Sequence, residues 1–321
     1  MQLATGYWAS ATLSAGVEIG LFDALGEEAH DAQDLAAATG TSRDHLLRLL
    51  EALASLGVLT RSGESFAIAP DLREFLCPDR PTSLLDALRF NIDLYPLWSR
   101  LGTSVREGKP AIPPTAHLGN DPARTERFVR GMHSRAMMLA PAVVDAIDLS
   151  GVVSMLDLAC GPGAFSRFLL AKHPALKSTL FDLTPVLDVA ERLLYRAPES
   201  QRITFHPGDY RRDVLPAPFD AIFYCGALHQ ETPESAGRLF AKIRASLRPG
   251  GRVIVVDLML QDDRAGPAFS ALFSLNMMLT SPAGRVFSEA ETIEILSTAG
   301  FIDVRRTPTG RSPYSIIEAS I

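Results

Sequence analysis

Residues 156–166 read LDLACGPGAFS, an apolar strand pattern that gives way to a run of small residues. A helical pattern, AFSRFLLAKH, begins within this stretch. Small residues between a strand and a helix let the backbone approach a ligand closely, and the first N–H groups of the helix then point at that ligand. Gly161 and Gly163 therefore predict a ligand-binding turn, although the same pair also fits a simple tight turn.

Two carboxylates and a serine narrow the class of ligand. Asp182 ends the next apolar strand, about 20 residues further on, where a carboxylate can accept hydrogen bonds from both ribose hydroxyls. Asp157 precedes the turn, where no dinucleotide-binding fold requires an acid. Ser166 occupies the third glycine position of the GxGxxG fingerprint, which disfavours a nicotinamide dinucleotide and a dehydrogenase. The set favours a nucleoside with a charged amino acid tail, S-adenosylmethionine.

Strand and helix patterns alternate after about residue 151. The strand candidates are VSMLDLA, STLFDL, ITFHPGD, AIFYCG and RVIVVDLML, and helical segments such as PVLDVAERLLYRA and ESAGRLFAKIRASL lie between them. Strands that alternate with helices of this length indicate a parallel sheet with helices on both faces. The fold class predicted for residues 148–321 is therefore α/β, a Rossmann-like doubly wound sheet.

The first hundred residues have a different pattern, dominated by helical periodicity. Residues 11–25 predict one helix with Gly26 as its stop, and a short helix ends at Gly40. Thr41 or Ser42 can cap the amphipathic helix that follows. The segment VLTRSGESFAIAP then predicts a hairpin, so the order is that of a winged helix-turn-helix domain. Residues 101–147 predict a connection, over 101–125, and a bridging helix, over 126–147.

Charge and cysteine content exclude several classes of protein. Of the 321 residues, 47% are hydrophobic, and the net charge is −6. The first hundred residues hold 14 acidic and 7 basic side chains, which argues against a surface for nucleic acid or an anionic membrane. No apolar run is long enough for a membrane span, and no secretory signal is visible. Three widely spaced cysteines favour a reducing cytoplasm over a disulfide framework or a zinc site.

From residue 156 onward the chain carries, in order, LDLACGPG, FDLTPVLDVA, HPGDYRRDVLP, ALHQETPE, LRPGGRVIVVDLML and FSEAETIEILSTAGF. In order and spacing these motifs resemble those of class I S-adenosylmethionine-dependent methyltransferases. They look most like the plant caffeic-acid and hydroxyindole O-methyltransferase group and its bacterial small-molecule relatives. The N-terminal third is similar to that group's dimerisation domain. The resemblance implies a homodimer that transfers a methyl group to a hydroxyl of a small, aromatic or partly hydrophobic acceptor.

The resemblance also implies positions for the cofactor. Asp209 has a reading from the residues as well: it ends a strand after Pro207-Gly208, where it can accept a hydrogen bond from the adenine amino group or cap the next turn. The glycine-rich turn would surround the methionine part, and the acid that ends the second strand would bind the ribose. The implied cofactor-binding residues are Ala159, Gly161, Gly163, Asp182, Leu183, Asp209, Tyr210, Cys225 and Gly226.

His229 is the predicted general base. A histidine in an LHDW motif removes the acceptor proton in the family that this chain resembles, and a neutral imidazole is suited to that step near neutral pH. The chain keeps Leu228-His229 but has Gln230-Glu231 in place of Asp-Trp. The two carboxylates implied to orient the histidine map to Asp257 and to Glu289. Glu289 has a competing reading as an ordinary first-turn acid of a helix that Ser288 caps.

The acceptor side is less defined. The resemblance implies Phe128, Met132 and Met277 as acceptor-lining residues, although methionines at helical spacing also suit a core. No His, Asp and Glu arrangement has metal-ligand spacing, so no metal is expected. Methylation of sulfur, carbon or nitrogen stays open as an alternative, because Asp-Trp is missing after the histidine. A winged-helix regulatory protein is the non-enzyme alternative.

Overall fold

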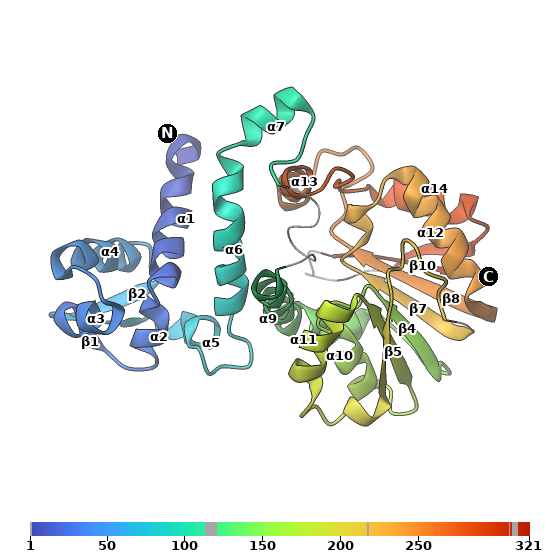
Figure 1. Ribbon diagram of the computed structural model, residues 1–321, viewed down its shortest axis with the longest axis horizontal. Coiled ribbons are helices and arrows are strands. Elements are labelled where there is room, and N and C mark those ends of the chain that lie inside the picture. Colours follow the sequence, from blue (N-terminus) through green and yellow to red (C-terminus); the bar gives the residue numbers. More distant parts are fainter. Residues whose placement is uncertain (1, 113–120, 217, 308, 310–313) are drawn as a thin grey trace. The chain divides into compact units, whose positions relative to one another are not determined.

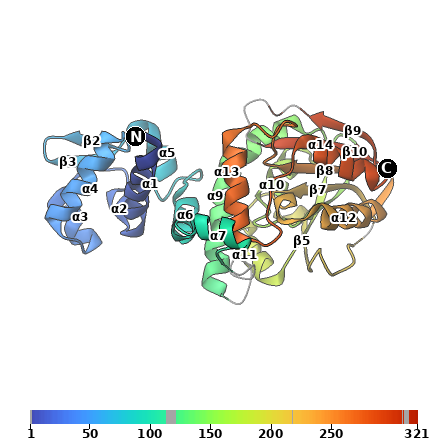
Figure 2. The same ribbon diagram turned by 90° about the horizontal axis from the view of Figure 1, so that it is seen from above.

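The computed structural model describes residues 2–112, 121–216, 218–307, 309 and 314–321; residues 113–120 of the predicted connection lie outside this part. The chain divides into two compact units, Met1–Pro96 with Arg130–Met137 and Leu97–Val129 with Met138–Ile321. Among the helices of the described residues, none has the length and apolar character that a membrane span needs. Each unit is described by itself below (Figures 1 and 2).

The first unit combines helices with a small antiparallel sheet of order β1-β3-β2. Its buried core includes Leu21, Phe22, Leu50 and Phe66. The helices and the β2–β3 hairpin follow the predicted winged-helix order. The elements are α1 (Gln2–Glu18), α2 (Leu21–Leu25), β1 (His30–Asp31), α3 (Ala32–Thr39), α4 (Arg43–Ser55), β2 (Leu59–Ser62), β3 (Ser65–Ile68), η1 (Pro70–Leu72), α5 (Arg73–Leu76) and α6 (Leu85–Trp98).

One predicted helix of this unit is in fact two. The expected helix over residues 11–25 is interrupted after Glu18, and a second helix begins at Leu21. Gly20 causes the break, because its φ of 72° lies in the left-handed region, which glycine adopts without steric cost. The break lets both Leu21 and Leu25 point into the core, where they are almost fully buried.

The second unit is an α/β domain built on a seven-stranded sheet of order β6-β5-β4-β7-β8-β10-β9. Figure 1 shows helices α10 and α12 beside this sheet, and Figure 2 shows helix α13 from the side. The elements are α7 (Leu101–Glu107), α9 (Pro122–Ala146), β4 (Ser154–Leu158), α10 (Ala164–Lys172), β5 (Lys177–Asp182), α11 (Thr184–Leu194), η2 (Ser200–Arg202), β6 (Ile203–Pro207), β7 (Phe219–Cys225), η3 (Leu228–Gln230), α12 (Pro233–Ala245), β8 (Leu247–Asp257), α13 (Ala268–Thr280), α14 (Glu289–Thr298), β9 (Ile302–Thr307) and β10 (Ser315–Ser320).

Helices cover both faces of the sheet, as the sequence predicts. Side chains alternate between the two faces along a strand. In β7, Ile222 and Tyr224 pack with Phe240 of α12, whereas Ala221 and Phe223 pack in the cluster that holds Leu169 of α10. The sheet is therefore buried on both sides, and only its strand ends and edges are open to a ligand.

The five predicted strands correspond to β4 through β8, which are parallel to their neighbours. The sheet is not parallel throughout, however, because β10 runs antiparallel to both β8 and β9. The parallel strands end at Leu158, Asp182, Pro207, Cys225 and Asp257. Carboxyl ends of parallel strands meet at one edge of a sheet, which is where ligands bind in open α/β folds. The predicted cofactor and base residues follow these ends.

Candidate active site

The turn between β4 and α10 brings backbone close to the edge of the sheet. Ala159, Gly161 and Gly163 all have positive φ, at 56°, 54° and 68°. A side chain on Gly163 would meet Leu180, since a Cβ there would lie 2.6 Å from its Cδ1. Gly161 has the opposite surroundings, with no atom within 4 Å of an added Cβ. The turn is thus packed on one side and open on the other.

Asp182 fastens this turn from the neighbouring strand. Its Oδ2 accepts a hydrogen bond from the backbone N–H of Gly161 at 2.8 Å, and its Oδ1 accepts one from Leu183 at 2.7 Å. Burial raises the pKa of Asp182 to about 6, against the lowering effect of these two N–H groups. The residue as a whole is nevertheless half-buried rather than fully buried, and its carboxylate has further lone pairs that could accept from hydroxyl donors.

Asp157 and Ser166 form a buried pair beneath the turn. The hydroxyl of Ser166 donates to Asp157 Oδ2 at 2.6 Å, and a second contact of 2.8 Å joins it to the hydroxyl of Ser178. Burial raises the pKa of Asp157 to about 7. A serine at the third glycine position therefore has a structural partner in this chain, because it hydrogen-bonds to the acid that sequence analysis found unusual there.

Asp209 caps the turn that follows β6. Its Oδ1 accepts the backbone N–H of Arg211 at 2.9 Å, and its Oδ2 lies 3.5 Å from Arg212 Nε. Its own N–H donates to Asp213 at 2.7 Å. These contacts match the capping alternative for Asp209, and the carboxylate keeps a partly exposed face toward solvent.

Tyr210 leads to a residue that sequence analysis did not assign. Its hydroxyl donates to Glu231 Oε1 at 2.8 Å, and Arg211 Nε donates to the same oxygen at 2.9 Å. Burial and the negative charge of Glu231 raise the pKa of Tyr210. The sequence marks Glu231 only as a departure from the LHDW motif; Tyr210 and Arg211 come from a distant segment, so no local pattern reveals these two contacts.

His229 sits on η3 with its ring held by Asp257. The distance from Nδ1 to Asp257 Oδ1 is 2.8 Å, and the backbone N–H of His229 donates to Oδ2 at 3.2 Å. The ring of Phe273 contacts the imidazole edge to face, with centroids 4.9 Å apart. A carboxylate at Nδ1 favours the tautomer with the proton on that nitrogen. Nε2 has no hydrogen-bond partner among the described residues, so its lone pair can accept a proton.

Glu289 does not share this role in the structure. It begins α14, which Ser288 caps, and its Oε1 accepts a hydrogen bond from Ser315 at 2.7 Å. Its Oε2 pairs with Arg306 Nε at 3.0 Å. Within the described chain, no hydrogen bond or ion pair links Glu289 to His229, and Asp257 is the carboxylate that contacts the ring. Both oxygens of Glu289 are instead engaged by residues of β10 and β9.

The remaining cofactor-side residues line the strand ends or pack beside them. Gly226 follows β7 with φ 67°, no atom within 4 Å of an added Cβ, and its N–H donating to Val256. Burial raises the pKa of Cys225 well above its ordinary value, so its thiol is protonated at neutral pH. Leu183 and Phe128 both pack against one small cluster that contains Val186.

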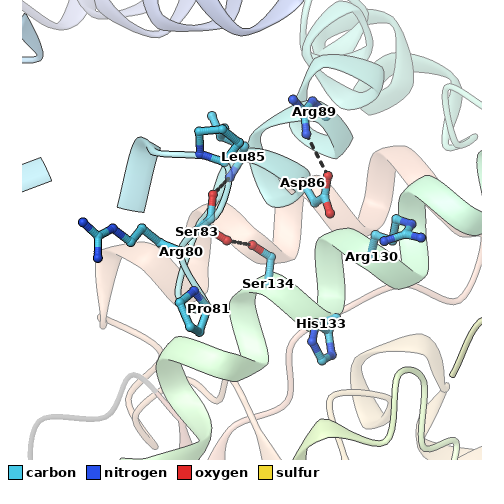
Figure 3. A pocket seen from close by; sticks show the side chains of 10 residues that line it. Arg80, Pro81, Ser83, Leu85, Asp86, Arg89, Arg130, His133 and Ser134 are labelled. Atoms are coloured by element: carbon cyan, nitrogen blue, oxygen red, sulfur yellow. Dashed lines mark hydrogen bonds and ion pairs between the residues drawn. The ribbon is translucent and has the colours of Figure 1, made fainter. Parts of the chain in front are cut away.

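The predicted acceptor residues fall in both units. Met277 is almost buried on α13, one turn after Phe273, and Met132 is half-buried in the α9 stretch of the first unit. The first unit also has a cavity of its own (Figure 3). Arg80 and Arg130 extend in opposite directions around it, and Ser134 donates to the backbone of Ser83. These side chains do not converge on a common point.

The described residues contain no cluster of three or more His, Cys, Asp or Glu side chains that could hold a metal ion. What the strand ends offer instead is an open glycine turn, the carboxylate of Asp182 and the imidazole of His229, whose Nε2 has no hydrogen-bond partner in the part of the chain that the structure describes. Such a set suits binding of a nucleoside and removal of a proton.

Comparison with protein families gives two matches. An O-methyltransferase domain family matches residues 98–302, and an O-methyltransferase dimerisation domain family matches residues 1–70. The dimerisation match lies in the first structural unit, and the O-methyltransferase match covers most of the second.

Individual relatives agree with the families. The tetracenomycin polyketide synthesis 8-O-methyl transferase TcmO of Streptomyces glaucescens is 31% identical over 96% of this chain and 92% of its own length. The 3-hydroxy-5-methyl-1-naphthoate 3-O-methyltransferase of Streptomyces sahachiroi is 31% identical over 95% of this chain and 89% of its own length. The crystal structure of human N-acetylserotonin methyltransferase in complex with SAM superposes with a TM-score of 0.91 at 27% identity, covering 99% and 95% of the two chains.

Proposed function

Because the chain belongs to the O-methyltransferase family, we propose that it transfers the methyl group of S-adenosylmethionine to a hydroxyl oxygen of a small aromatic molecule. The names of its relatives support the class of acceptor: a naphthoate, an N-acetylserotonin and a tetracenomycin polyketide. The observation that carries the proposal is the imidazole of His229, held at Nδ1 by Asp257 beside the nucleoside-binding strand ends.

The strand-end residues fit S-adenosylmethionine. Gly161 and Gly226 leave open space where a side chain would otherwise stand, which lets a ligand lie against the backbone. Asp182 would accept the ribose hydroxyls, Leu183 and Tyr210 would lie along the adenine, and Asp209 would bind its amino group. Ala159, Gly163 and Cys225 would shape the pocket around the methionine part. The bound cofactor supplies an electrophilic methyl group on a sulfonium leaving group.

The chain's own contribution to the reaction is alignment and proton removal. His229 Nε2 would accept the proton of the acceptor hydroxyl, while Asp257 keeps the opposite ring nitrogen protonated and stabilises the positive charge that develops on the ring. Phe273 packs edge to face against the imidazole ring. Only one proton has to move, so positioning the acceptor oxygen in line with the methyl group is the remaining requirement.

The acceptor would lie beside Phe128 and Met277, whose apolar side chains suit an aromatic ring. The assignment of Met132 to the acceptor site rests on the resemblance alone. The winged-helix DNA-binding alternative is not proposed, since the N-terminal residues match the family's dimerisation domain. Methylation of sulfur, carbon or nitrogen gains no support from the site geometry.

We further propose that the chain forms a homodimer through its N-terminal domain, and binds neither nucleic acid nor a membrane surface. The helix α1 exposes Leu3, Tyr7 and Trp8, which are 100%, 60% and 60% accessible. Exposed apolar side chains gathered on one helix mark a surface that a partner covers. A cytoplasmic location would suit Cys77, Cys160 and Cys225, none of which forms a disulfide.

Methyl transfer tests the proposal directly. Purified protein is incubated with S-adenosylmethionine tritiated in the methyl group and a panel of hydroxynaphthoates and hydroxyindoles, and product radioactivity is counted. Label should appear in at least one acceptor, and His229→Ala should reduce its rate while S-adenosylhomocysteine still binds. Protein that binds neither S-adenosylmethionine nor S-adenosylhomocysteine would contradict the proposal. An unchanged rate in His229→Ala would assign the histidine to structure.

A further inference from the structure

A buried carboxylate lies two residues beyond the predicted base. Glu231 is only 3% exposed, although it follows directly on the η3 turn that carries His229. Its backbone N–H donates to Leu228 at 3.0 Å, so its main chain belongs to that turn. Its side chain points away from the turn, toward the segment that follows β6.

Both carboxylate oxygens of Glu231 accept hydrogen bonds. Oε1 accepts from the Tyr210 hydroxyl at 2.8 Å and from Arg211 Nε at 2.9 Å, and Oε2 accepts from the Ser235 hydroxyl. Arg211 also donates from Nη2 to the carbonyl oxygen of Gln230 at 3.2 Å. The segment after β6 and the turn after β7 are therefore joined by three hydrogen bonds, one of which, from Arg211 to Glu231, is also an ion pair.

Stability alone does not account for this arrangement. The ion pair is only half buried, because the Arg211 side chain is 49% exposed. Water weakens the attraction on the arginine side, and burial of the carboxylate costs desolvation energy, so the net contribution of the pair to stability is small. What such a pair does provide is a defined geometry, because charged hydrogen-bond partners lose far more energy than apolar ones when they separate. Glu231 therefore constrains the relative position of its two segments.

Each of the two segments has its own separate anchor. Lys242 of α12 donates to the carbonyl oxygens of Tyr210 and Asp213, at 2.7 and 2.8 Å, which holds the segment after β6. Asp257 at the end of β8 holds His229. Glu231 lies between these anchors: its backbone belongs to the turn that carries His229, and its side chain accepts hydrogen bonds from Tyr210 and Arg211 of the other segment.

We propose that Glu231 is a positioning residue that keeps the adenine-side segment with Tyr210 and the turn with His229 in one fixed arrangement, so that cofactor and base are aligned together. The inference rests on the proposed function, which puts Tyr210 beside the adenine. Loss of Glu231 should disturb both cofactor binding and the environment of the base, although its side chain is assigned to neither.

The test compares Glu231→Ala and Glu231→Gln with Glu234→Gln, an exposed carboxylate three residues further along that serves as the matched control. S-adenosylhomocysteine affinity is measured by calorimetry, and the His229 imidazole is followed by NMR, assigned through its absence in His229→Ala. Glu231→Ala should raise the Kd about tenfold and shift the His229 signal. Glu231→Gln, which keeps an acceptor for Tyr210, should lie between this variant and wild type. Glu234→Gln should match wild type.

A second pair of variants keeps the test informative if Glu231→Ala unfolds. Tyr210→Phe removes only the hydroxyl that donates to Glu231. If the two residues act through one contact, the Kd changes of Tyr210→Phe and Glu231→Gln should not multiply in the double variant. Multiplicative effects, or a wild-type Kd in both Glu231 variants, would overturn the inference while leaving the methyltransferase proposal intact. Wild-type protein that does not bind S-adenosylhomocysteine would overturn the proposed function first, and the inference with it.

Discussion

Asp257 contacts His229 twice, through the ring and through the backbone. One oxygen lies 2.8 Å from Nδ1, and the other accepts the His229 backbone N–H at 3.2 Å. The N–H of Leu258 donates to the first oxygen as well, at 2.7 Å. Aspartate is one methylene shorter than glutamate, but the η3 turn lies against the end of β8, so the shorter side chain reaches the ring.

Replacing Asp257 by asparagine should therefore reverse the tautomer of the His229 imidazole. The amide NH2 of Asp257→Asn would donate to Nδ1, which moves the ring proton to Nε2 and removes the lone pair that accepts the substrate proton. We expect kcat to fall by about a hundredfold or more, the range typical of a lost general base. S-adenosylhomocysteine affinity should stay within about twofold. Asp257→Glu, which keeps an acceptor, should retain more activity, and an unaltered kcat in Asp257→Asn would show that the tautomer is irrelevant.

Glu289 should be far less important for the reaction than Asp257. Its carboxylate is engaged by Ser315 and Arg306, on strands β10 and β9, rather than by the imidazole. We expect Glu289→Gln to change kcat less than threefold and to lower the free energy of unfolding by about 1 kcal/mol or less, since its side chain is 29% exposed. Steady-state kinetics and urea denaturation separate the two effects. A loss of kcat as large as that of Asp257→Asn would restore Glu289 to the catalytic group.

The sequence predicts strands β4 through β8, whose carboxyl ends form the candidate site, better than it predicts strands β9 and β10. Strands β4, β5, β7 and β8 contain buried apolar runs, whereas β6, at the edge of the sheet, alternates half-buried and exposed residues. Each of the five ends in, or is followed by, the small or acidic residues that a ligand needs, so both the strands and their functional ends can be inferred. Strand β9 reads IDVRRT, in which charged residues outnumber apolar ones at an exposed edge. No hydrophobic period marks it, and the antiparallel hairpin with β10 is invisible to local patterns.

The same limit applies to the contacts of two acids, Glu289 and Glu231. The partners of Glu289 come from β9 and β10, and two of the three partners of Glu231, Tyr210 and Arg211, come from the segment after β6. Both sets of contacts depend on tertiary packing between segments distant in sequence. The contact between His229 and Asp257, in contrast, follows once β7 and β8 are recognised as parallel neighbours, because both residues lie at the carboxyl ends of these strands.

Cofactor affinity should depend on pH through Asp182. Its pKa is raised to about 6 by burial, so the carboxylate is ionised above pH 6 and takes up a proton below it. Ribose hydroxyls donate better to the ionised form. We expect the Kd for S-adenosylhomocysteine to be constant above about pH 7 and to rise by up to tenfold per pH unit below pH 6. Calorimetry from pH 5 to 8 measures it. Asp182→Asn should bind more weakly at pH 8 and show no such slope; a slope that persists would locate the titrating group elsewhere.

Stability should depend on pH through Asp157. Burial raises its folded-state pKa to about 7, whereas the unfolded chain has the ordinary value of about 4. Between these values the unfolded state loses its proton first, so the free energy of unfolding falls as pH rises from about 4 to 7 and is constant above. Asp157→Asn removes this titration and keeps an acceptor for Ser166. As pH rises through that window, the free energy of unfolding of the variant should increase relative to that of wild type by up to about 1.4 kcal/mol per pH unit. The free energy of unfolding of both proteins is measured by urea denaturation at several pH values. A difference between variant and wild type that does not change from pH 4 to 7 would rule out the raised pKa of Asp157.

Gly163 should tolerate no side chain, in contrast with a glycine elsewhere in the same unit. Its φ of 68° is unfavourable for other residues, and a Cβ would lie 2.6 Å from Leu180 Cδ1 and 2.8 Å from Leu194 Cδ1. Gly163→Ala should lower the free energy of unfolding by about 2–4 kcal/mol, from left-handed backbone strain and overpacking together. Gly237, inside helix α12, has no atom within 4 Å of an added Cβ, so Gly237→Ala should instead stabilise by about 0.5–1 kcal/mol. Urea denaturation of both variants gives the two signs. Equal effects at the two positions would show that the turn after β4 can relax, and that Leu180 and Leu194 do not confine it.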